Sequence, residues 1–484
     1  MTTPSTGLTW RFPKAFWTAN IVELLERAAW YGVFVSITLY LSRILAFSDL
    51  EAATISGVFT AGLYFLPTFA GAYADRIGYR AALMLAFGLL TVGYASMWVL
   101  PTLLENAGLV RYGVPVSGGV DPDAVGRMVV FTGLETGWHK WLFIPVMLVV
   151  MVGGSFIKSV ITGTVARETT EANRARGYSI FYAMVNVGAF SGKTIVKPLR
   201  VSLGDEGFIV LNLFAAGMTL LAFILVAAFY RSAHHEGAAK QMSEIWRALV
   251  AVLTRARLII LILIITGFWM VQHQLYASMP KYVLRMVGEG ASPSWLANVN
   301  PAAVVLTVSL VTHLMRNRTA LSSMTVGMFI MPVSALCMAG SNLIGQGDLL
   351  GMHPVTFMMI VGIAFQGLAE SFISPRFLEY FSLQAPKGEE GLYLGFSHLH
   401  SFISAIVGFF LSGLLLERFC PDPRTLDAAD RAQRLLALKG EAPMPEAYAH
   451  AHYIWIVFVG IALASALSLI IFGAVTRRLD AKQG

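Results

Sequence analysis

Three ionisable residues lie close together in the first long apolar segment, Phe16 to Leu45: Glu23, Glu26 and Arg27. Spacings of three and four residues place their side chains on one face of a helix, where the acids can pair with the guanidinium or bind a proton. A charged side chain at the centre of a bilayer costs roughly 2.5 to 3.5 kcal/mol, so we predict that they face a protein interior. The alternative is a structural pair that stabilises a helix contact, but such a pair needs only one acid.

Two further charges lie at similar depth in later apolar segments, Lys158 and Glu370. If all five residues share one cavity, three acids oppose two bases and leave one excess negative charge. A poorly hydrated site tends to neutralise such a charge with a proton, which predicts a proton carrier. Neighbouring carboxylates titrate as a coupled set, so the proton cannot be assigned to one glutamate.

The elements that must position these residues are membrane-spanning helices. The chain has 484 residues, of which 56% are hydrophobic and 13% charged, whereas soluble domains carry about 25% charged residues. Apolar runs of about 20 residues, the length that crosses the hydrocarbon, recur along the chain. The sequence predicts an all-α polytopic membrane protein with about twelve spans: Phe16 to Leu45, Glu51 to Ala74, Ala81 to Leu103, Trp141 to Val165, Tyr178 to Val201, Phe208 to Tyr230, Leu258 to Val287, Leu296 to Met315, Leu321 to Ile344, Thr356 to Leu383, Leu392 to Leu416 and Tyr453 to Val475.

A polar stretch, Arg231 to Arg257, divides these spans into two sets of six. We therefore predict an N-terminal bundle over residues 1–230, a cytoplasmic linker over 231–257 and a C-terminal bundle over 258–484. Two long loops, Leu104 to Lys140 and Glu417 to His452, are expected to cover helix ends. The second contains helical spacing over Thr425 to Leu438.

Basic residues gather in the loops of one side, including Arg76, Arg80, Arg316 and Arg318. This bias predicts that both termini are cytoplasmic, in the plasma membrane or, in a bacterium, the inner membrane. The net charge of +7 reflects the same bias, so no nucleic-acid partner is expected. The two cysteines favour neither a disulfide framework nor a metal site, and we expect no cofactor beyond protons as the coupling ion.

Several motifs resemble a known transporter family. Residues 23–32, ELLERAAWYG, resemble the E-x-x-E-R-F-x-Y-Y-G signature of the proton-dependent oligopeptide transporter family, and residues 71–80 resemble the loop motif of the wider major facilitator superfamily. Further matches follow in the family's order: Lys158 in the fourth helix, Phe181, Tyr182, Asn186 and Gly188 in the fifth, Asn300-Pro301 in the eighth, and Glu370 and Ser374-Pro375 in the tenth.

The resemblance implies a major facilitator fold, in which two six-helix bundles rock around a central cavity. It also implies symport of di- and tripeptides with protons. Arg27 and Lys158 then suit the peptide carboxylate, and Glu370 suits its ammonium group. The remaining substrate-binding residues are two amides and three hydroxyl-bearing rings: Asn186, Asn300, Tyr31, Tyr64 and Tyr182.

The chain departs from the family at two positions. Phe34 and His273 stand where the family commonly has an arginine and a glutamate. Because both partners of one ion pair are absent, we expect packing or a neutral contact to close the outer gate. His273 could titrate in place of the glutamate, or it could be a hydrogen-bonded lining residue.

The resemblance further implies a cytoplasmic contact between helices, with a role in gating, for Asp75, Arg76 and Arg80. The predicted protein is thus a monomeric, proton-coupled importer of short peptides that works by alternating access. The alternative is a major facilitator carrier of amino acids, peptide-like compounds or other small organic ions, with altered or absent proton coupling. A sensor or membrane enzyme is disfavoured, because the sequence offers no paired nucleophile and base, metal-ligand cluster or phosphate loop.

Overall fold

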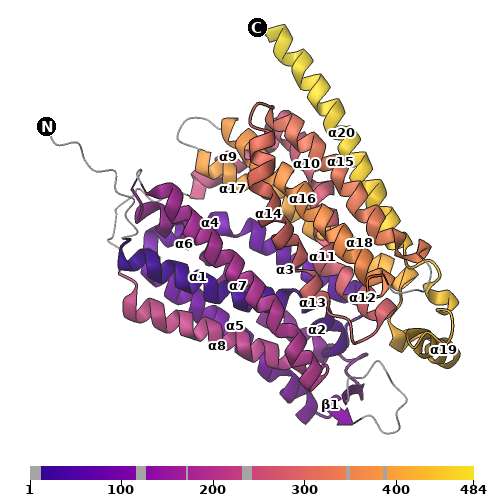
Figure 1. The fold of residues 1–484 in the computed structure, drawn as a ribbon. Coiled ribbons are helices and arrows are strands. Elements are labelled where there is room, and N and C mark those ends of the chain that lie inside the picture. The colour runs from indigo at the N-terminus through magenta and orange to yellow at the C-terminus, as the bar shows by residue number, and fades with distance from the viewer. Residues whose placement is uncertain are drawn as a thin grey trace.

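The computed structural model describes residues 12–115, 127–170, 173–231, 242–344, 349–384 and 390–483, which form mostly long helices (Figure 1). The described residues of the first half include eight α-helices. They are α1 (Lys14–Phe34), α2 (Ile37–Arg43), α3 (Asp49–Phe65), α4 (Pro67–Ile77), α5 (Tyr79–Asn106), α6 (Phe143–Arg167), α7 (Arg174–Leu203) and α8 (Glu206–Phe229).

The second half continues with helices of the same kind, several of them broken into consecutive pieces. They are α9 (Met242–Thr254), α10 (Ala256–Gln272), α11 (Gln274–Ala277), α12 (Met279–Val287), α13 (Pro293–Leu296), α14 (Val299–Leu314), α15 (Ala320–Ala339), α16 (Pro354–Leu383), α17 (Glu390–Ser397), α18 (Leu399–Phe419), α19 (Ala428–Leu438) and α20 (Tyr453–Gln483). Helix α9 occupies the latter part of the predicted linker, while residues 232–241 lie outside the described part. The linker boundaries stay a prediction.

The number of spans agrees with the sequence. Within the described residues, nine helical stretches are long and apolar enough to cross a membrane, and the bent pair α3 and α4, with axes 47° apart, makes one more. Helices α1 and α7 have 21 and 30 residues, and at about 1.5 Å per residue both are long enough to cross the hydrocarbon. Their charged residues lower their hydropathy. With these two, the described helices supply the predicted twelve spans.

Helices of each half pack mainly on one another. Helix α1 lies against α7 and α8, and α15 lies against α16 and α20. The halves meet along α3 and α18, which approach closely at two glycines: a Cβ on Gly57 would lie 2.8 Å from the Ala405 carbonyl oxygen, and one on Gly413 would lie 2.7 Å from Leu50 Cα. Small residues permit this approach, because a larger side chain would separate the helices.

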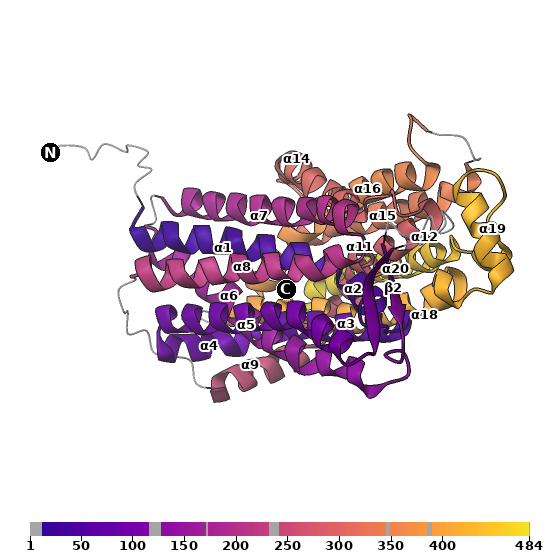
Figure 2. The same ribbon diagram turned by 90° about the horizontal axis from the view of Figure 1, so that it is seen from below.

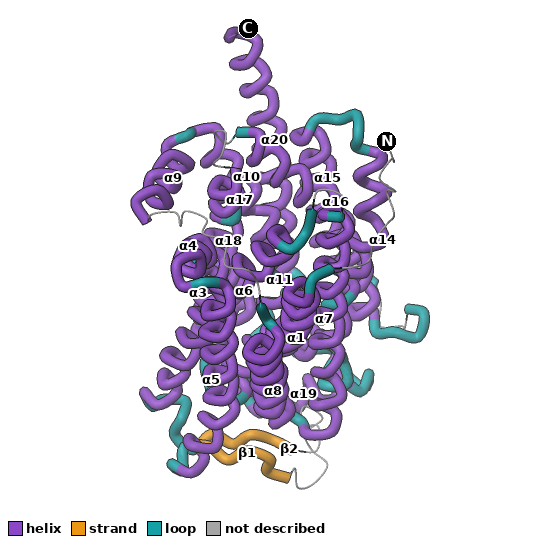
Figure 3. Tube along the Cα trace, turned by 90° about the vertical axis from the view of Figure 1, so that its left-hand side faces the viewer, coloured by secondary structure: helices purple, strands orange, loops and turns teal. Residues whose placement is uncertain are grey.

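The two ends of the helical bundle carry different covers (Figures 1 to 3). One end, called here the α19 end, carries α19 and an antiparallel hairpin of β1 (Val110–Pro115) and β2 (Arg127–Phe131). The opposite end, called the α9 end, carries α9 and the last turns of α20. Helix α19 confirms the helical spacing found over Thr425 to Leu438. The hairpin was not predicted from the sequence.

Candidate functional site

The charged cluster of α1 is buried and internally paired. Glu23 and Glu26 are 4% and 3% exposed. Arg27 Nε lies 3.2 Å from Glu23 Oε1, and Arg27 Nη2 lies 2.5 Å from Glu26 Oε2. One guanidinium therefore pairs with two carboxylates, so this cluster of three residues carries one more negative charge than positive when both acids are ionised.

Close contact between α1 and α7 holds this cluster in place. Gly188 and Gly192, one turn apart on α7, lie against the α1 backbone so tightly that a Cβ on Gly188 would lie 2.7 Å from the Arg27 Cβ. Gly188 is thus a packing position between helices. Without these glycines, α7 could not approach the turn of α1 that carries Arg27.

Lys158 lies on α6, at a cleft on the α9 side of the molecule, whose lining includes Ile245 of α9. The cleft has a volume of about 370 Å³, and its lining includes Tyr64 and Asp75 from the first half and His398 from the second. Lys158 Nζ lies 3.4 Å from His398 Nε2, so this contact joins the two halves. Lys158 also lies near enough to act electrostatically on Glu23.

Glu370, on α16, accepts two amide hydrogen bonds from its own half. Gln272 Nε2 donates to Glu370 Oε2 at 2.7 Å, and Asn300 Nδ2 donates to the same oxygen at 3.4 Å. Asn300 therefore lies where the resemblance implies. Gln272 was not singled out from the sequence, although it directly precedes His273.

Lys193 was missed entirely by the sequence analysis. It is 2% exposed on α7, donates a hydrogen bond to the Ala297 carbonyl at 3.2 Å, and lies 4.9 Å from the Tyr31 ring centroid. It also lies near enough to Glu370 for a favourable charge interaction. Lys193 lies seven residues after Asn186, which is two turns along the same helix face. This spacing could have predicted that Lys193 faces the cavity.

Lys193 corrects the predicted charge balance. With it, the described centre contains three bases, Arg27, Lys158 and Lys193, which match the three acids. The predicted excess of one negative charge is wrong, because Lys193 supplies the missing cation. A proton-binding role must therefore depend on how substrate rearranges the pairs.

The predicted tyrosines and His273 line the same region. The Tyr64 ring lies 6.2 Å from the His273 ring and 6.1 Å from the His398 ring. His273 is buried among such rings, and its Nδ1 lies 3.3 Å from Ser404 Oγ. Among the described residues, no carboxylate pairs with the His273 ring. A role for His273 in proton transfer stays a prediction.

Two residues of α7 that were predicted to bind substrate make no hydrogen bond to Glu370 among the described residues. Asn186 donates to the carbonyl of Tyr182, on its own helix, at 2.8 Å, and does not reach Glu370. The Tyr182 side chain is 58% exposed but remains close enough for an electrostatic effect of Glu370. The structure therefore brings Asn300 to the Glu370 carboxylate, whereas the Asn186 amide bonds to its own helix.

The α19 end is closed by buried ion pairs between the halves. Asp49, the first residue of α3, accepts from Lys281 Nζ at 2.6 Å and from Arg285 at 2.7 and 2.9 Å. All three side chains are nearly inaccessible. Glu289, which follows α12, pairs with Arg43 at 2.6 Å and also with Arg200.

These ion pairs correct the predicted gate. Phe34 does pack across the halves, with its ring 5.0 Å from Tyr276 and 6.4 Å from Phe409. Closure by packing or a neutral contact alone is nevertheless wrong, because the charged pairs lie nearer the helix ends, beyond Phe34. Other ion pairs, those of Asp49 and Glu289, therefore close this end in place of the pair that the family commonly has.

The Glu289 pairs persist in mild acid. Burial alone would raise the pKa of Glu289, but Arg43 and Arg200 outweigh burial and hold it below the ordinary value. The stability that this carboxylate contributes is therefore present above its ordinary pKa, and it is lost only as the pH falls through the lowered value. Between pH 5 and 8 the Glu289 pairs do not titrate.

The residues predicted to act in gating lie near the α9 end, and among the described residues the hydrogen bonds of Asp75 and Arg80 are with the first half. Asp75 accepts from Arg167 Nη2 at 3.0 Å, and Arg80 Nη2 donates to the Ala227 carbonyl at 2.6 Å. Arg76 is exposed. Asp75 also lines the cleft beside Lys158. Their gating role stays a prediction.

Comparison with known proteins places these features in a family. Residues 19–351, more than half of the chain, match the model of the Major Facilitator Superfamily. The chain is 22% identical over 442 residues to dipeptide and tripeptide permease A of Proteus mirabilis (strain HI4320), covering 82% of this chain and 85% of that protein. It is 36% identical to dipeptide and tripeptide permease B of Xenorhabdus bovienii (strain SS-2004), over 93 residues, or 19% of each chain.

Solved structures share the same fold. A POT family transporter in complex with a thioalcohol-conjugated peptide superposes with a TM-score of 0.68 at 16% identity, covering 97% of this chain and 98% of that one. A structure from work on substrate recognition in proton-dependent oligopeptide transporters gives 0.63 at 20% identity, covering 95% and 99%. The chain belongs to the Major Facilitator Superfamily, as a multi-pass membrane transporter whose relatives include dipeptide and tripeptide permeases.

Proposed function

We propose that this protein imports di- and tripeptides together with protons, by alternating access. One observation supports this most strongly: the balanced set of buried acids and bases adjoins a cleft on the α9 side of the molecule, while ion pairs close the α19 end. The names of its relatives point to the same cargo. A cavity closed at one end only is typical of one conformation in an alternating-access cycle.

The cavity complements a zwitterion at both ends. Arg27 and Lys158 lie on the first-half wall and suit a peptide carboxylate. Glu370, with its two amide donors, lies on the opposite wall and suits an ammonium group. Because only the peptide's ends need charged partners, side-chain pockets can accept varied residues.

Coupling to protons follows from competition for Arg27. An entering carboxylate takes hydrogen bonds from the guanidinium that Glu23 and Glu26 now share. The displaced acid has no other cation as close, and a poorly hydrated carboxyl without a partner binds a proton. Protons are then the coupling ion, and the mechanism uses no cofactor and no chemical reaction.

The proposed orientation places the α9 end in the cytoplasm of the cell, with the protein in the plasma membrane or bacterial inner membrane. Basic residues of the loops at this end, including Arg76 and Arg80, support it. The cleft then faces inward, and the chain works as a monomer with its own complete cavity.

The function is tested with purified protein in liposomes, a panel of peptides and an imposed pH gradient. We expect accumulation of di- and tripeptides when the outside is acidic, and none when the gradient is removed. The same assay includes amino acids and 5-aminolevulinic acid, which one structural neighbour binds. Accumulation of these compounds without peptide flux would instead support a carrier of small organic ions.

Glu26→Gln should separate transport from its driving force. Because glutamine cannot bind and release the proton, we expect loss of pH-driven accumulation, while exchange of labelled for unlabelled peptide across the membrane continues. Glu379→Gln is a matched control, because Glu379 pairs with Arg376 at an exposed position on one helix. Concentration of peptide by the Glu26→Gln protein under a pH gradient alone would refute this coupling role.

A further inference from the structure

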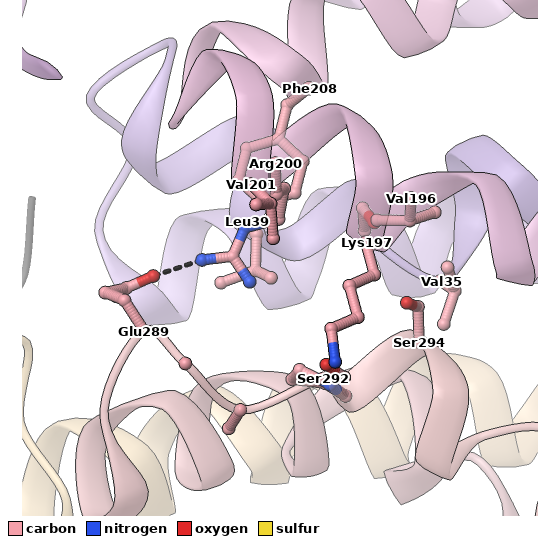
Figure 4. A pocket seen from close by; sticks show the side chains of 14 residues that line it. Val35, Leu39, Val196, Lys197, Arg200, Val201, Phe208, Glu289, Ser292 and Ser294 are labelled. Carbon is pink, nitrogen blue, oxygen red and sulfur yellow. Dashed lines mark hydrogen bonds and ion pairs between the residues drawn. The ribbon is translucent and has the colours of Figure 1, made fainter. Parts of the chain in front are cut away.

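A second, smaller pocket lies beside the ion pairs of the α19 end (Figure 4). Its volume is about 110 Å³, enough for several waters or one small anion. Three segments form most of its wall, and Phe208 of α8 completes it: the break between α1 and α2 with Leu39, the last turns of α7, and residues 289–294, from the loop after α12 to the start of α13. The first two belong to the first half and the third to the second half, so the pocket exists only when this end is closed.

The polar groups of this pocket are mainly donors. Lys197 Nζ extends towards Ser292 (Figure 4), and within the described part of the chain it has no carboxylate partner, only the ring of Trp295 at 4.4 Å. Arg200, 7% exposed, has a buried Nε without a hydrogen-bond partner among the described residues. Ser292 Oγ is buried and unpartnered in the same sense.

The one carboxylate on the pocket wall is already engaged. Glu289 binds Arg43 through one oxygen and Arg200 through the other. Asp205 also pairs with Arg43, at 3.2 Å. Two acids therefore balance two guanidiniums, and the Lys197 ammonium is left as an unbalanced positive charge. A half-buried cation beside two unsatisfied donors favours an acceptor-only ligand.

We propose that this pocket binds an oxyanion, of the phosphate or carboxylate type, which bridges the two halves of the protein. Lys197 and Arg200 Nε contribute from α7, and Ser292 contributes from the second half. Because both halves supply donors, a bound anion stabilises the conformation in which the α19 end is closed. The site is separate from the central cavity, since α7 carries Lys197 one turn beyond Lys193.

The same chemistry could come from solution or from a lipid phosphate. Trp295 and Val201, which flank Lys197, are 45% and 63% exposed near helix ends, where aromatic and basic residues meet lipid headgroups. Inorganic phosphate and an anionic phospholipid therefore serve as the two probes. The site does not depend on the cargo of the central cavity, so its test is independent of peptide transport.

The test uses the whole protein in nanodiscs of zwitterionic lipid, with Trp295 as the local reporter. Inorganic phosphate is titrated at constant ionic strength, and the fluorescence change that is lost in Trp295→Phe is followed. We expect a saturable change, with affinity at least tenfold weaker in both Lys197→Gln and Ser292→Ala. Lys439→Gln, at an exposed lysine beside α19, should bind like the unaltered protein.

A second arm replaces part of the zwitterionic lipid with phosphatidylglycerol and omits phosphate. A Lys197-dependent change in this arm alone assigns the site to a lipid headgroup, and a change with phosphate assigns it to a soluble oxyanion. The absence of a saturable Trp295 signal in both arms would overturn the proposal. Equal affinities of the unaltered, Lys197→Gln and Ser292→Ala proteins would overturn it as well.

Discussion

Replacing Arg27 with glutamine should lower the initial rate of peptide uptake about 100-fold or more. The guanidinium is the closest cation to both Glu23 and Glu26, at 3.2 and 2.5 Å. Removing one partner of a buried ion pair typically costs about 3 to 5 kcal/mol, because the remaining charge keeps its desolvation penalty. Here two carboxylates would remain, and the peptide carboxylate would also lose its donor. Uptake by proteoliposomes measures the loss.

Two variants sharpen this result. Arg27→Lys keeps the charge but not the fork of donors, so it should recover only part of the rate. Arg418→Gln removes an arginine from the exposed outer turn of α18 and should leave uptake unchanged. Near-normal uptake by a folded Arg27→Gln protein would show that the cluster has a structural role only.

Asp49→Asn should open the α19 end. The substitution removes the carboxylate that Lys281 contacts and leaves Arg285 with the longer contact to Asp422, at 3.5 Å, and both cations belong to the half opposite Asp49. The closed conformation loses about 3 to 5 kcal/mol relative to one in which water reaches these cations. A shift of that size moves a strongly closed population to a mixed or mainly open one.

The opening of the α19 end is detected by electron–electron distance measurements between two spin labels. The labels are placed at Asn106 and Arg418, in a protein from which Cys337 and Cys420 have been removed. We expect a new, longer distance in Asp49→Asn that is absent from the unaltered protein and from Glu379→Gln. Identical distance distributions in all three would mean that the Asp49 pairs do not hold this end closed. The remaining Glu289 pairs would then carry the closure.

The charged cluster of α1 could be read from the sequence because its chemistry conflicts with its surroundings. Three charges within an apolar run have few physical explanations, and regular spacing predicts their common face. The span count was predictable for the same reason, since hydrocarbon thickness fixes helix length. Breaks such as the one between α1 and α2 were not, because local sequence does not show where a bundle bends.

Charged residues near the ends of spans could not be recognised as buried from the sequence. Asp49 and Glu289 lie where acidic residues meet water in most membrane proteins, so nothing marked them as buried. Asp49 and Arg285 lie 236 residues apart, and only the packing of the two halves reveals their contact. The predicted gate was therefore wrong about ion pairs while it was right about Phe34 packing.

Lys193 shows a different limit. It lies inside a predicted span together with Lys197 and Arg200, and the sequence alone does not show which of the three faces the centre. In the structure the three residues differ: Lys193 faces the centre, Lys197 lines the small pocket, and Arg200 pairs with Glu289. Their depth along α7, rather than their type, separates these roles.

Proton uptake on peptide binding tests the central claim most directly. Dialanine is added to the purified protein in weakly buffered solution, and a pH indicator measures protons taken up while calorimetry measures the peptide bound. We expect net proton uptake by the unaltered protein, and its loss when Glu23 and Glu26 are both replaced by glutamine. Peptide binding without proton uptake, or equal uptake by the double variant, would contradict the central claim.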